Sequence, residues 1–287
     1  MRAAQIRELK QPPELVELDD GGEIAIEAVA LNPLDIAVGS GVFYGGHPPL
    51  PYAPGCEAAG RTADGRLVYL FGGGRGTTQP GFLAERVQAG DDLTLTLPSG
   101  VDPAVAAAVG IAGIAAWVPV AWRAQPSAED RVLVLGATGA VGQVAVQAAI
   151  LLGAAKVVGV GSGDLHRIGE EFADDGFTVC IDPVWGEPLA NALQHAARHA
   201  RIVHLGQSAG PESPLRSADV RGKELTIVGH SNFALTKETR DRAYLELLDH
   251  VVGGRIELQL ERYPLDRVAE AWERQRSGPG AKVVITL

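Results

Sequence analysis

The chain has 287 residues, of which 46% are hydrophobic and 21% charged, which is typical of a soluble globular protein long enough for two domains. Its net charge of −10 comes without a basic stripe or basic tail, which argues against nucleic acid as a partner. The start, MRAAQIRELKQ, lacks the apolar core of a secretory signal, and two cysteines, Cys56 and Cys180, cannot form a framework of disulfides. We therefore expect a cytoplasmic protein with reduced cysteines.

The first hundred residues predict a β-rich domain. Residues 23–30 alternate apolar and polar side chains, as a half-buried strand does, and NPLD at 32–35 breaks this strand and can start a short helix. The stretch HPPLPYAPG at 47–55 favours an extended, rigid conformation because prolines are frequent. Further short strands are expected within 60–71 and 81–87, which together suggest a compact barrel-like domain.

An alanine-rich helical stretch begins at Asp102 and Pro103, with Asp102 as N-cap and Pro103 in the first helical position. The most apolar part of the chain follows, from Ala104 to Trp122. Because this part contains two glycines and a proline, it is typical of a buried core helix rather than of a membrane span. We place a domain boundary at this change of character and expect no membrane association.

The segment from Arg131 to Val160, RVLVLGATGAVGQVAVQAAILLGAAKVVGV, predicts one βαβ unit. The run VLVL at 132–135 is apolar on both faces, as a central parallel strand requires. Apolar residues then recur at helical spacing up to Leu152, and Gly153 is placed to end that helix. Between the strand and the helix lies the turn Gly136-Ala137-Thr138-Gly139-Ala140-Val141-Gly142.

This glycine turn predicts a binding site for a dinucleotide. Glycine permits a tight reversal of the chain and lets a phosphate approach without a Cβ in the way. The free N–H groups at the start of the following helix face that phosphate, and the helix dipole adds to the attraction. Because the spacing GxxGxxG lies between a buried strand and an apolar helix, we favour this interpretation over a βα turn that binds nothing.

The end of the second strand favours NADPH over NADH. An NAD site usually has Asp or Glu there to hold the ribose 2′-OH, whereas this strand ends in Gly161 and Ser162, with Asp164 close by. Small residues leave room for a 2′-phosphate, and the guanidinium of Arg167 can pair with it in bidentate geometry. The alternative is that Arg167 is an ordinary solvated helix residue.

Beyond this unit, strands and helices are predicted up to the end of the chain. The expected strands lie at 178–181, 201–205, 225–228 and 282–285. The expected helices lie near 164–171 and at 188–200 and 238–252.

Several motifs together resemble a known family. The chain resembles the medium-chain dehydrogenase/reductase superfamily, in its zinc-independent quinone oxidoreductase branch. The matching stretches occur in family order and are NPLD (32–35), PGCEAAG (54–60), LGATGAVGQVAVQAA (135–149), DPVWGE (182–187), RIVHLGQSAG (201–210) and GAKVVITL (280–287).

The resemblance implies an α/β fold with two domains. A Rossmann-type, doubly wound parallel sheet would occupy 104–236, and a β-rich, GroES-like barrel catalytic domain would be formed by 1–103 and 237–287. The cofactor and the substrate would lie in the cleft between these domains, beyond the carboxyl ends of the strands.

The resemblance also bears on zinc. Zinc-dependent relatives have a cysteine where this chain has Asn32 and a histidine where it has Cys56, and a lone Cys56 cannot supply the three ligands of a catalytic zinc. His195 and His199 lie four apart on an expected helix, but no third ligand is evident, so we predict no metal. What remains is hydride transfer from NADPH to an acceptor that needs no Lewis acid, and the resemblance implies a quinone or a carbonyl-conjugated C=C bond. The alternative is an NADP(H)-binding protein with little or no catalysis, acting as a redox sensor or structural partner.

Negative charge would develop on the carbonyl oxygen of the substrate, and the candidate hydrogen-bond donors there are Asn32, Tyr44 and Tyr52. Asn32 matches an asparagine that lines the nicotinamide end in the family, or else it forms an Asx turn before the proline. Tyr44 lies near a family Tyr-Pro pair, a slot that Phe43 can also occupy, and Tyr52 can simply pack in the proline-rich loop. Solvent can supply the proton instead. The resemblance places further cofactor contacts, with ordinary βα loops as the alternative, at Val184, Gly206, Gln207, Ser208, Ser231, Asn232 and Phe233.

The sequence departs from the family pattern in two places. Between Arg167 and Asp182 it is too short, so we infer that one strand and a neighbouring helix of the Rossmann sheet are missing or reduced. That segment often carries part of the 2′-phosphate site, which weakens the NADPH prediction. Residues 61–75 replace a longer two-strand passage, which would leave the cleft more open. The strand at 225–228 is expected at a sheet edge that relatives pair between subunits, so we predict a homodimer.

Overall fold

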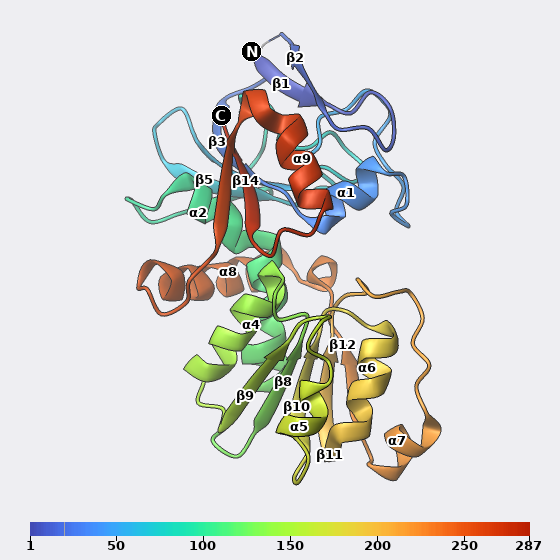
Figure 1. The fold of residues 1–287 in the computed structure, drawn as a ribbon. Helices are drawn as coiled ribbons and strands as arrows, with labels where there is room; N and C mark the ends of the chain where they lie inside the picture. The colour runs from blue at the N-terminus through green and yellow to red at the C-terminus, as the bar shows by residue number, and fades with distance from the viewer. Residues whose placement is uncertain (20) are drawn as a thin grey trace. The chain divides into compact units, whose positions relative to one another are not determined.

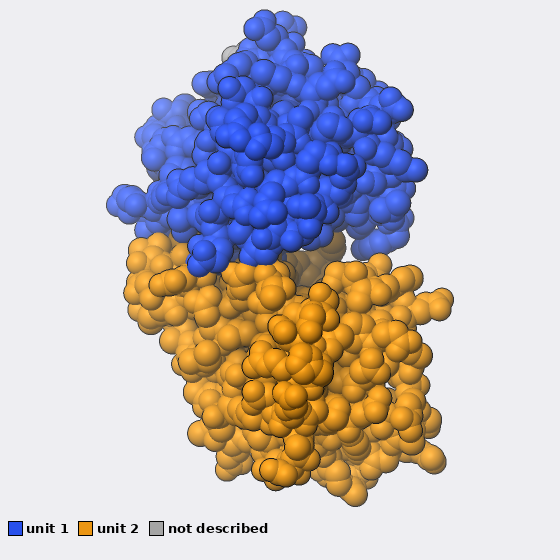
Figure 2. All heavy atoms as spheres, viewed as in Figure 1, with its two compact units in different colours: residues 1–111, 258–287 blue, residues 112–257 orange. Residues whose placement is uncertain are grey.

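The computed structural model describes residues 1–19 and 21–287, and the chain forms two compact units, coloured separately in Figure 2. Unit 1 consists of Met1–Ile111 and Leu258–Leu287, and unit 2 of Ala112–Glu257. These divisions differ from 103/104 and 236/237 in the sequence analysis, most of all at helix α8 (Lys237–Val252). That helix packs inside unit 2, where one carboxylate oxygen of Glu246 accepts hydrogen bonds from the indoles of Trp117 (3.1 Å) and Trp122 (3.0 Å).

Unit 1 contains a mixed sheet of short strands. These are β3 (Ile24–Ala30), β4 (Glu57–Arg61), β5 (Leu67–Phe71), β6 (Arg86–Val87), β7 (Thr94–Thr96), β13 (Leu260–Pro264) and β14 (Lys282–Thr286). Their order is β13-β14-β3-β4-β5-β7, with β6 paired to β3, and a separate antiparallel pair joins β1 (Arg2–Gln5) to β2 (Glu14–Glu17). Strand β14 pairs antiparallel with β3, so the end of the chain completes a sheet that begins near its start (Figure 1).

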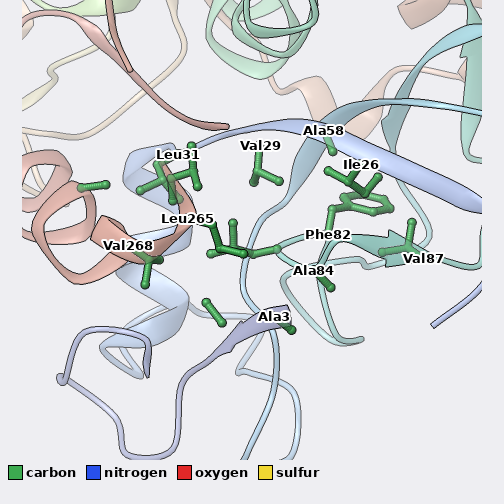
Figure 3. Packing of buried hydrophobic residues seen from close by; sticks show 14 of the residues in the cluster. Ala3, Ile26, Val29, Leu31, Ala58, Phe82, Ala84, Val87, Leu265 and Val268 are labelled. Atoms are coloured by element: carbon green, nitrogen blue, oxygen red, sulfur yellow. The ribbon is translucent and has the colours of Figure 1, made fainter. Parts of the chain in front are cut away.

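The core of unit 1 lies between this sheet and helix α9 (Val268–Arg276), as Figure 3 shows. The ring of Phe82 lies beside Ile26 and Val87, while Leu265 and Val268 come from the C-terminal segment. Residues 23–30 were predicted as a half-buried strand, and β3 confirms the strand; burial alternates from Ile24 to Ala28, but Val29 and Ala30 are buried as well. The short helix that NPLD was predicted to start is α1 (Pro33–Gly39).

The apolar stretch is a helix of changing pitch. It begins with α2 (Pro103–Ala108), where the Asp102 carboxylate accepts a hydrogen bond from the amide of Ala104 (2.8 Å), so the predicted N-cap is confirmed. After a kink at Gly110 (φ −58°, ψ −111°), it continues through α3 (Ile114–Trp117) and two π-helical segments to Ala124. Pro103–Ala124 is long and apolar enough to cross a membrane, but 78% of its apolar 18-residue stretch is buried inside the protein, as in a core helix.

Unit 2 is built on a parallel sheet. Its strands are β8 (Arg131–Leu135), β9 (Lys156–Val160), β10 (Phe177–Asp182), β11 (Ala196–His204) and β12 (Thr226–Gly229). Within the described residues the sheet has the order β12-β11-β10-β8-β9. This is the common Rossmann order without its third strand, so the predicted loss of one strand is confirmed.

Helices cover both faces of this sheet (Figure 1). On one face, Leu133 and Leu135 of β8 pack in a cluster with α5 (Arg167–Glu171) and α6 (Gly186–Ala192). On the other face lie α3 and α4 (Ala140–Leu151), while α7 (Ser217–Gly222) precedes β12. Helix α4 ends where the sequence predicted, with Gly153 just beyond it at φ +86°. The α/β fold class, a parallel Rossmann-type sheet plus a separate β-rich unit, is confirmed.

The helix predicted for 188–200 is wrong in its second half. Helix α6 stops at Ala192, a single 3-10 turn follows, and β11 begins at Ala196, directly opposite Phe177 of β10. Pairing with β10 buries Ala196 and Ala200 and overrides the helical preference of an alanine-rich stretch.

Candidate functional site

The turn between β8 and α4 is too tight for side chains at its two ends. Gly136 has φ +61°, a conformation that L residues rarely adopt. A Cβ on Gly142 would lie only 2.2 Å from the carbonyl oxygen of Gly136 and 2.6 Å from Cα of Ala137. The N-cap of α4 is Gly139, which has no side chain to accept hydrogen bonds from the first amides of the helix. The first amides of α4 are therefore not capped by a side chain of that residue, and an anion fits this arrangement.

Three loops meet at the carboxyl edge of the parallel sheet. A Cβ on Gly136 would lie 2.9 Å from Cγ1 of Val184, so the glycine turn touches the loop after β10. A Cβ on Gly206 would lie 2.5 Å from the carbonyl oxygen of Pro183, so the loop after β11 touches the same segment. Gln207 and Ser208 of that third loop are exposed. The structure thus brings together candidates that are up to 70 residues apart in the chain, as the carboxyl ends of adjacent parallel strands should.

The end of β9 lies against the glycine turn. A Cβ on Gly161 would be 3.0 Å from the methyl of Thr138 and 3.9 Å from a carboxylate oxygen of Asp164. Ser162 is exposed, and Arg167 begins α5 with its guanidinium 3.5 Å from Glu171. Exposed pairs of this kind contribute little, about 0–1 kcal/mol, so Arg167 stays available for a stronger anion such as a phosphate.

The segment after β12 carries the last three candidates. The Ser231 hydroxyl accepts a hydrogen bond from the amide of Phe233 (3.3 Å), and Phe233 is 55% exposed. Asn232 Oδ1 lies 3.0 Å from Nε2 of His230, and the His230 amide donates to the carbonyl of His204 (2.8 Å). Burial lowers the pKa of His230, which favours the neutral imidazole. The segment is therefore tied to the end of β11.

A carboxylate organises the loop after β10. Asp182 is fully buried, and its Oδ1 accepts hydrogen bonds from the amides of Val184 (3.0 Å) and Trp185 (2.8 Å). Its Oδ2 lies 2.9 Å from Nδ1 of His204, which ends β11 directly opposite Asp182. The Trp185 ring packs on the imidazole of His204 with centroids 4.1 Å apart.

Unit 1 holds a second group of polar residues, buried around Glu57. Its Oε1 accepts hydrogen bonds from Asn32 Nδ2 (2.8 Å) and Lys282 Nζ (3.0 Å), and its Oε2 accepts from the Tyr69 hydroxyl (2.9 Å) and the Ile111 amide (2.5 Å). Lys282 also donates to Asn32 Oδ1. A charged pair in this position needs such a set of partners, because an unpaired buried charge is strongly destabilising.

Asn32 belongs to this buried group and is also the N-cap of α1. Its two amide hydrogens point to Glu57 and to the carbonyl of Ala30 (3.2 Å), and the residue is 2% exposed. The neighbouring helix α1 is held by Asp35, whose carboxylate accepts from the amides of Asn32 (2.8 Å) and Cys56 (2.9 Å). Burial raises the pKa of Asp35, and burial and Asp35 raise the pKa of the Cys56 thiol.

The two candidate tyrosines lie in opposite environments. Tyr44 is 89% exposed and packs on Phe43, with ring centroids 4.5 Å apart. Tyr52 is 1% exposed in the core of unit 1, and its hydroxyl has no hydrogen-bond partner among the described residues. Burial raises the pKa of Tyr52, with a further contribution from Asp35. Among residues 1–19 and 21–287, no hydrogen bond joins either tyrosine to Asn32.

The metal-binding spacing of two histidines is not realised. His195 ends the 3-10 turn after α6, whereas His199 lies in β11 with φ +61° and donates its amide to the carbonyl of Lys223 (2.7 Å). The two therefore do not share a helix face. In the described part of the chain, no group of three or more His, Cys, Asp or Glu side chains is arranged to hold a metal ion.

The sequence analysis missed the partners of the candidate residues. Glu57 and Lys282 each begin a strand and are followed by three small or apolar residues, AAG and VVI, and opposite charges in such surroundings predict a buried pair. Their sequence separation of 225 hides the contact, because it depends on β14 pairing with β3. His204 carried a similar signal as a polar end to the apolar run RIVH.

Comparisons with known proteins agree with this architecture. A family model described as zinc-binding dehydrogenase matches residues 152–285. The quinone oxidoreductase of Lama guanicoe is 30% identical over 301 aligned positions, which cover 92% of this chain and 88% of that protein. The solved quinone oxidoreductase of Thermus thermophilus, described also in complex with NADPH, superposes with a TM-score of 0.82 at 24% identity, covering both chains completely.

A solved NAD-dependent alcohol dehydrogenase matches equally well in fold, with a TM-score of 0.83 at 22% identity and complete coverage of both chains. At these identities the structures establish the fold, and the curated relative establishes the family. With the glycine turn, the parallel sheet and the β-rich unit all in place, the chain belongs to the medium-chain dehydrogenase/reductase superfamily, in its quinone oxidoreductase branch.

Proposed function

We propose that this protein is an NADPH-dependent oxidoreductase that transfers hydride to a quinone or to a carbonyl-conjugated C=C bond without zinc. The observation that carries the proposal is the glycine turn, where Gly136 and Gly142 approach so closely that a Cβ on Gly142 would meet a carbonyl oxygen at 2.2 Å. Glycine at both positions leaves the backbone ahead of α4 uncovered by side chains, and the amides and dipole of the helix start suit the negative charge of a pyrophosphate. The curated relatives named quinone oxidoreductase support the substrate class.

The residues present fit a dinucleotide along the carboxyl edge of the sheet. The turn from Gly136 to Gly142 would hold the pyrophosphate, and Gly161, Ser162 and Arg167 would hold the 2′-phosphate. The nicotinamide half would lie on the loops that contain Val184, Gly206, Gln207, Ser208, Ser231, Asn232 and Phe233. When bound, the nicotinamide supplies the hydride. The protein then contributes position and hydrogen bonds at the reacting groups.

The donor to the developing oxyanion is assigned to Tyr44. Asn32 directs both amide hydrogens into the buried group around Glu57, and the Tyr52 hydroxyl lies in the core, whereas the Tyr44 side chain is exposed. The absence of zinc chemistry is supported by the same group, because Asn32 Oδ1 accepts from Lys282 and the Cys56 thiol is buried with a raised pKa. Both features are poor for a metal ligand, which must be deprotonated and free.

Oxidation of NADPH and of NADH against a panel of quinones and 2-alkenals tests the proposal, alongside elemental analysis of the purified protein. Turnover with NADPH as the better cofactor is expected. Tight NADPH binding without turnover of any acceptor would favour the alternative of a binding protein, and stoichiometric zinc would refute the metal-free mechanism.

A pair of glycine variants localises the site. Gly142→Ala should weaken NADPH binding at least about tenfold, because the turn backbone must shift away from the phosphate. Gly222→Ala in α7 is the matched control, since a Cβ there meets nothing within 4 Å. Equal NADPH dissociation constants for the two variants, measured by fluorescence titration, would show that the turn is not part of the binding site.

We also propose a cytoplasmic homodimer that pairs through β12. This strand ends the parallel sheet, and Val228 on it is 39% exposed. An open edge with apolar side chains is otherwise a liability. Sedimentation equilibrium should give a dimer for the wild-type chain and a monomer for Val228→Lys, and a monomeric wild-type chain would refute this interface.

A further inference from the structure

A strained residue lies beside the loops assigned to the cofactor. Trp185 has φ +58° and ψ −155°, a strained backbone conformation that is essentially restricted to glycine. Asp182 holds it there through the amide hydrogen bond of 2.8 Å. The strained backbone presents the indole to the imidazole of His204, with ring centroids 4.1 Å apart. Strain of this kind persists where the surrounding structure needs a particular side chain in a particular place.

The partners of His204 determine which of its nitrogens carries the proton. Oδ2 of Asp182 lies 2.9 Å from Nδ1, and an ionised carboxylate can only accept, so Nδ1 carries the hydrogen. In the neutral ring Nε2 is then an acceptor. Within the described ranges the imidazole contacts Asp182 and Trp185, and no hydrogen bond satisfies Nε2. The His204 side chain is 27% exposed, so this nitrogen belongs to a partly open group with a fixed tautomer.

The position of His204 relates this acceptor to the dinucleotide. His204 ends β11, two residues before Gly206, and lies opposite Asp182 at the carboxyl edge of the sheet. The loop that Asp182 organises also touches the glycine turn, through Val184 and Gly136. Ligands of such sheets lie beyond the carboxyl ends of the strands.

We propose that His204 is a further cofactor-binding residue, which accepts a hydrogen bond through Nε2 from a ribose hydroxyl of the bound dinucleotide. Asp182 and Trp185 act as positioning residues, because one fixes the tautomer and the other covers a face of the ring. This inference rests on the proposed function and extends it to a side-chain contact. A neutral imidazole with a fixed Nδ1–H suits a hydroxyl donor, whereas an anionic phosphate oxygen would need a donor in its place.

The variant His204→Asn separates this role from a structural one. Its amide nitrogen can replace Nδ1 and keep the hydrogen bond to Asp182, but nothing remains at the position of Nε2. The NADPH dissociation constant should rise about fivefold to tenfold, as expected for the loss of one hydrogen bond, with an unchanged thermal midpoint. His204→Gln, whose amide can reach the Nε2 position, should recover part of the affinity.

The outcomes separate the two proposals. Equal NADPH affinity of the wild-type chain and His204→Asn would overturn this inference alone, since the histidine would then serve only to satisfy Asp182. A higher KM for the quinone with an unchanged NADPH dissociation constant would overturn it too, because His204 would then act on the binding of the acceptor and not on that of NADPH. If the wild-type chain did not bind NADPH, the proposed function would fail and this inference with it.

Discussion

Removing the charge of Lys282 should destabilise unit 1 severely. Lys282→Met keeps the length of the side chain and deletes the ammonium, which leaves Glu57 without a counter-charge in a fully buried position. The side chains of the pair are 5% and 0% exposed, and their charged atoms are 3.0 Å apart. With an effective dielectric constant of about 20, the Coulomb attraction at that distance is about 5.5 kcal/mol before desolvation is subtracted.

The expected loss in the free energy of unfolding is about 3–5 kcal/mol, which is typical when one partner of a buried ion pair is removed. The lower half of this range is favoured, because Asn32, Tyr69 and the Ile111 amide still donate to Glu57. Glu57→Gln should cost a similar amount. Glu57 accepts all four of its hydrogen bonds. The amide nitrogen of the glutamine would replace one of the two oxygens, and its N–H groups would then face groups that also donate.

Urea unfolding followed by circular dichroism measures both variants and the double variant Glu57→Gln/Lys282→Met. The double variant should lose at least about 2 kcal/mol less than the sum of the single variants. Arg267→Met is the control, since its pair with Glu270 is about half exposed and should contribute at most about 1 kcal/mol. A loss below about 1 kcal/mol for Lys282→Met, or strict additivity, would refute the reasoning.

Three further outcomes are expected. Tyr52→Phe deletes a buried hydroxyl that has no partner among the described residues. Urea unfolding should therefore show a stability that is equal or higher by about 1 kcal/mol, and kcat/KM should not change. A large fall in kcat/KM would show that Tyr52 takes part in catalysis. Burial alone would raise the pKa of Asp130, but hydrogen bonds from Ser127, Thr178 and Arg201 lower it overall. Its stabilisation is therefore present above the unfolded pKa of about 3.9 and lost as pH falls through the folded value, so the stability gap to Asp130→Asn should close in acid and persist at neutral pH. Because burial raises the pKa of Cys56 and Cys180, a thiol reagent should react with neither cysteine until the chain is unfolded, and rapid reaction of the native protein would contradict the structure.

Local signals in the sequence were sufficient for much of the fold. The Asp102 cap, the glycine turn and the Gly153 stop each depend on neighbouring residues, and each lies where it was predicted. The missing strand was predicted from the family resemblance, because the interval between Arg167 and Asp182 is too short for the helix, strand and helix that relatives usually have there.

What the sequence could not provide depends on contacts between distant segments. His199 lies in a strand because β11 pairs with β10, although its neighbours favour a helix. The buried group around Glu57 forms only once β14 has joined β3. The link between Asp182 and His204 likewise follows from the parallel register of two strands. In each case the residue was visible, but its partner could not be read from nearby sequence.

Because the third strand is missing, β9 forms an edge of the parallel sheet at the surface of unit 2. Among residues 1–19 and 21–287, strand β9 pairs only with β8, so its outer backbone groups lie at the edge where the third strand would have bonded. This edge is short, and it starts with Lys156, whose ammonium lies 3.0 Å from Glu171 and over the ring of Phe172. A charge at the first position discourages a foreign strand from docking there. At this edge of the sheet, the shortened chain thus has a paired lysine in the place of a neighbouring strand.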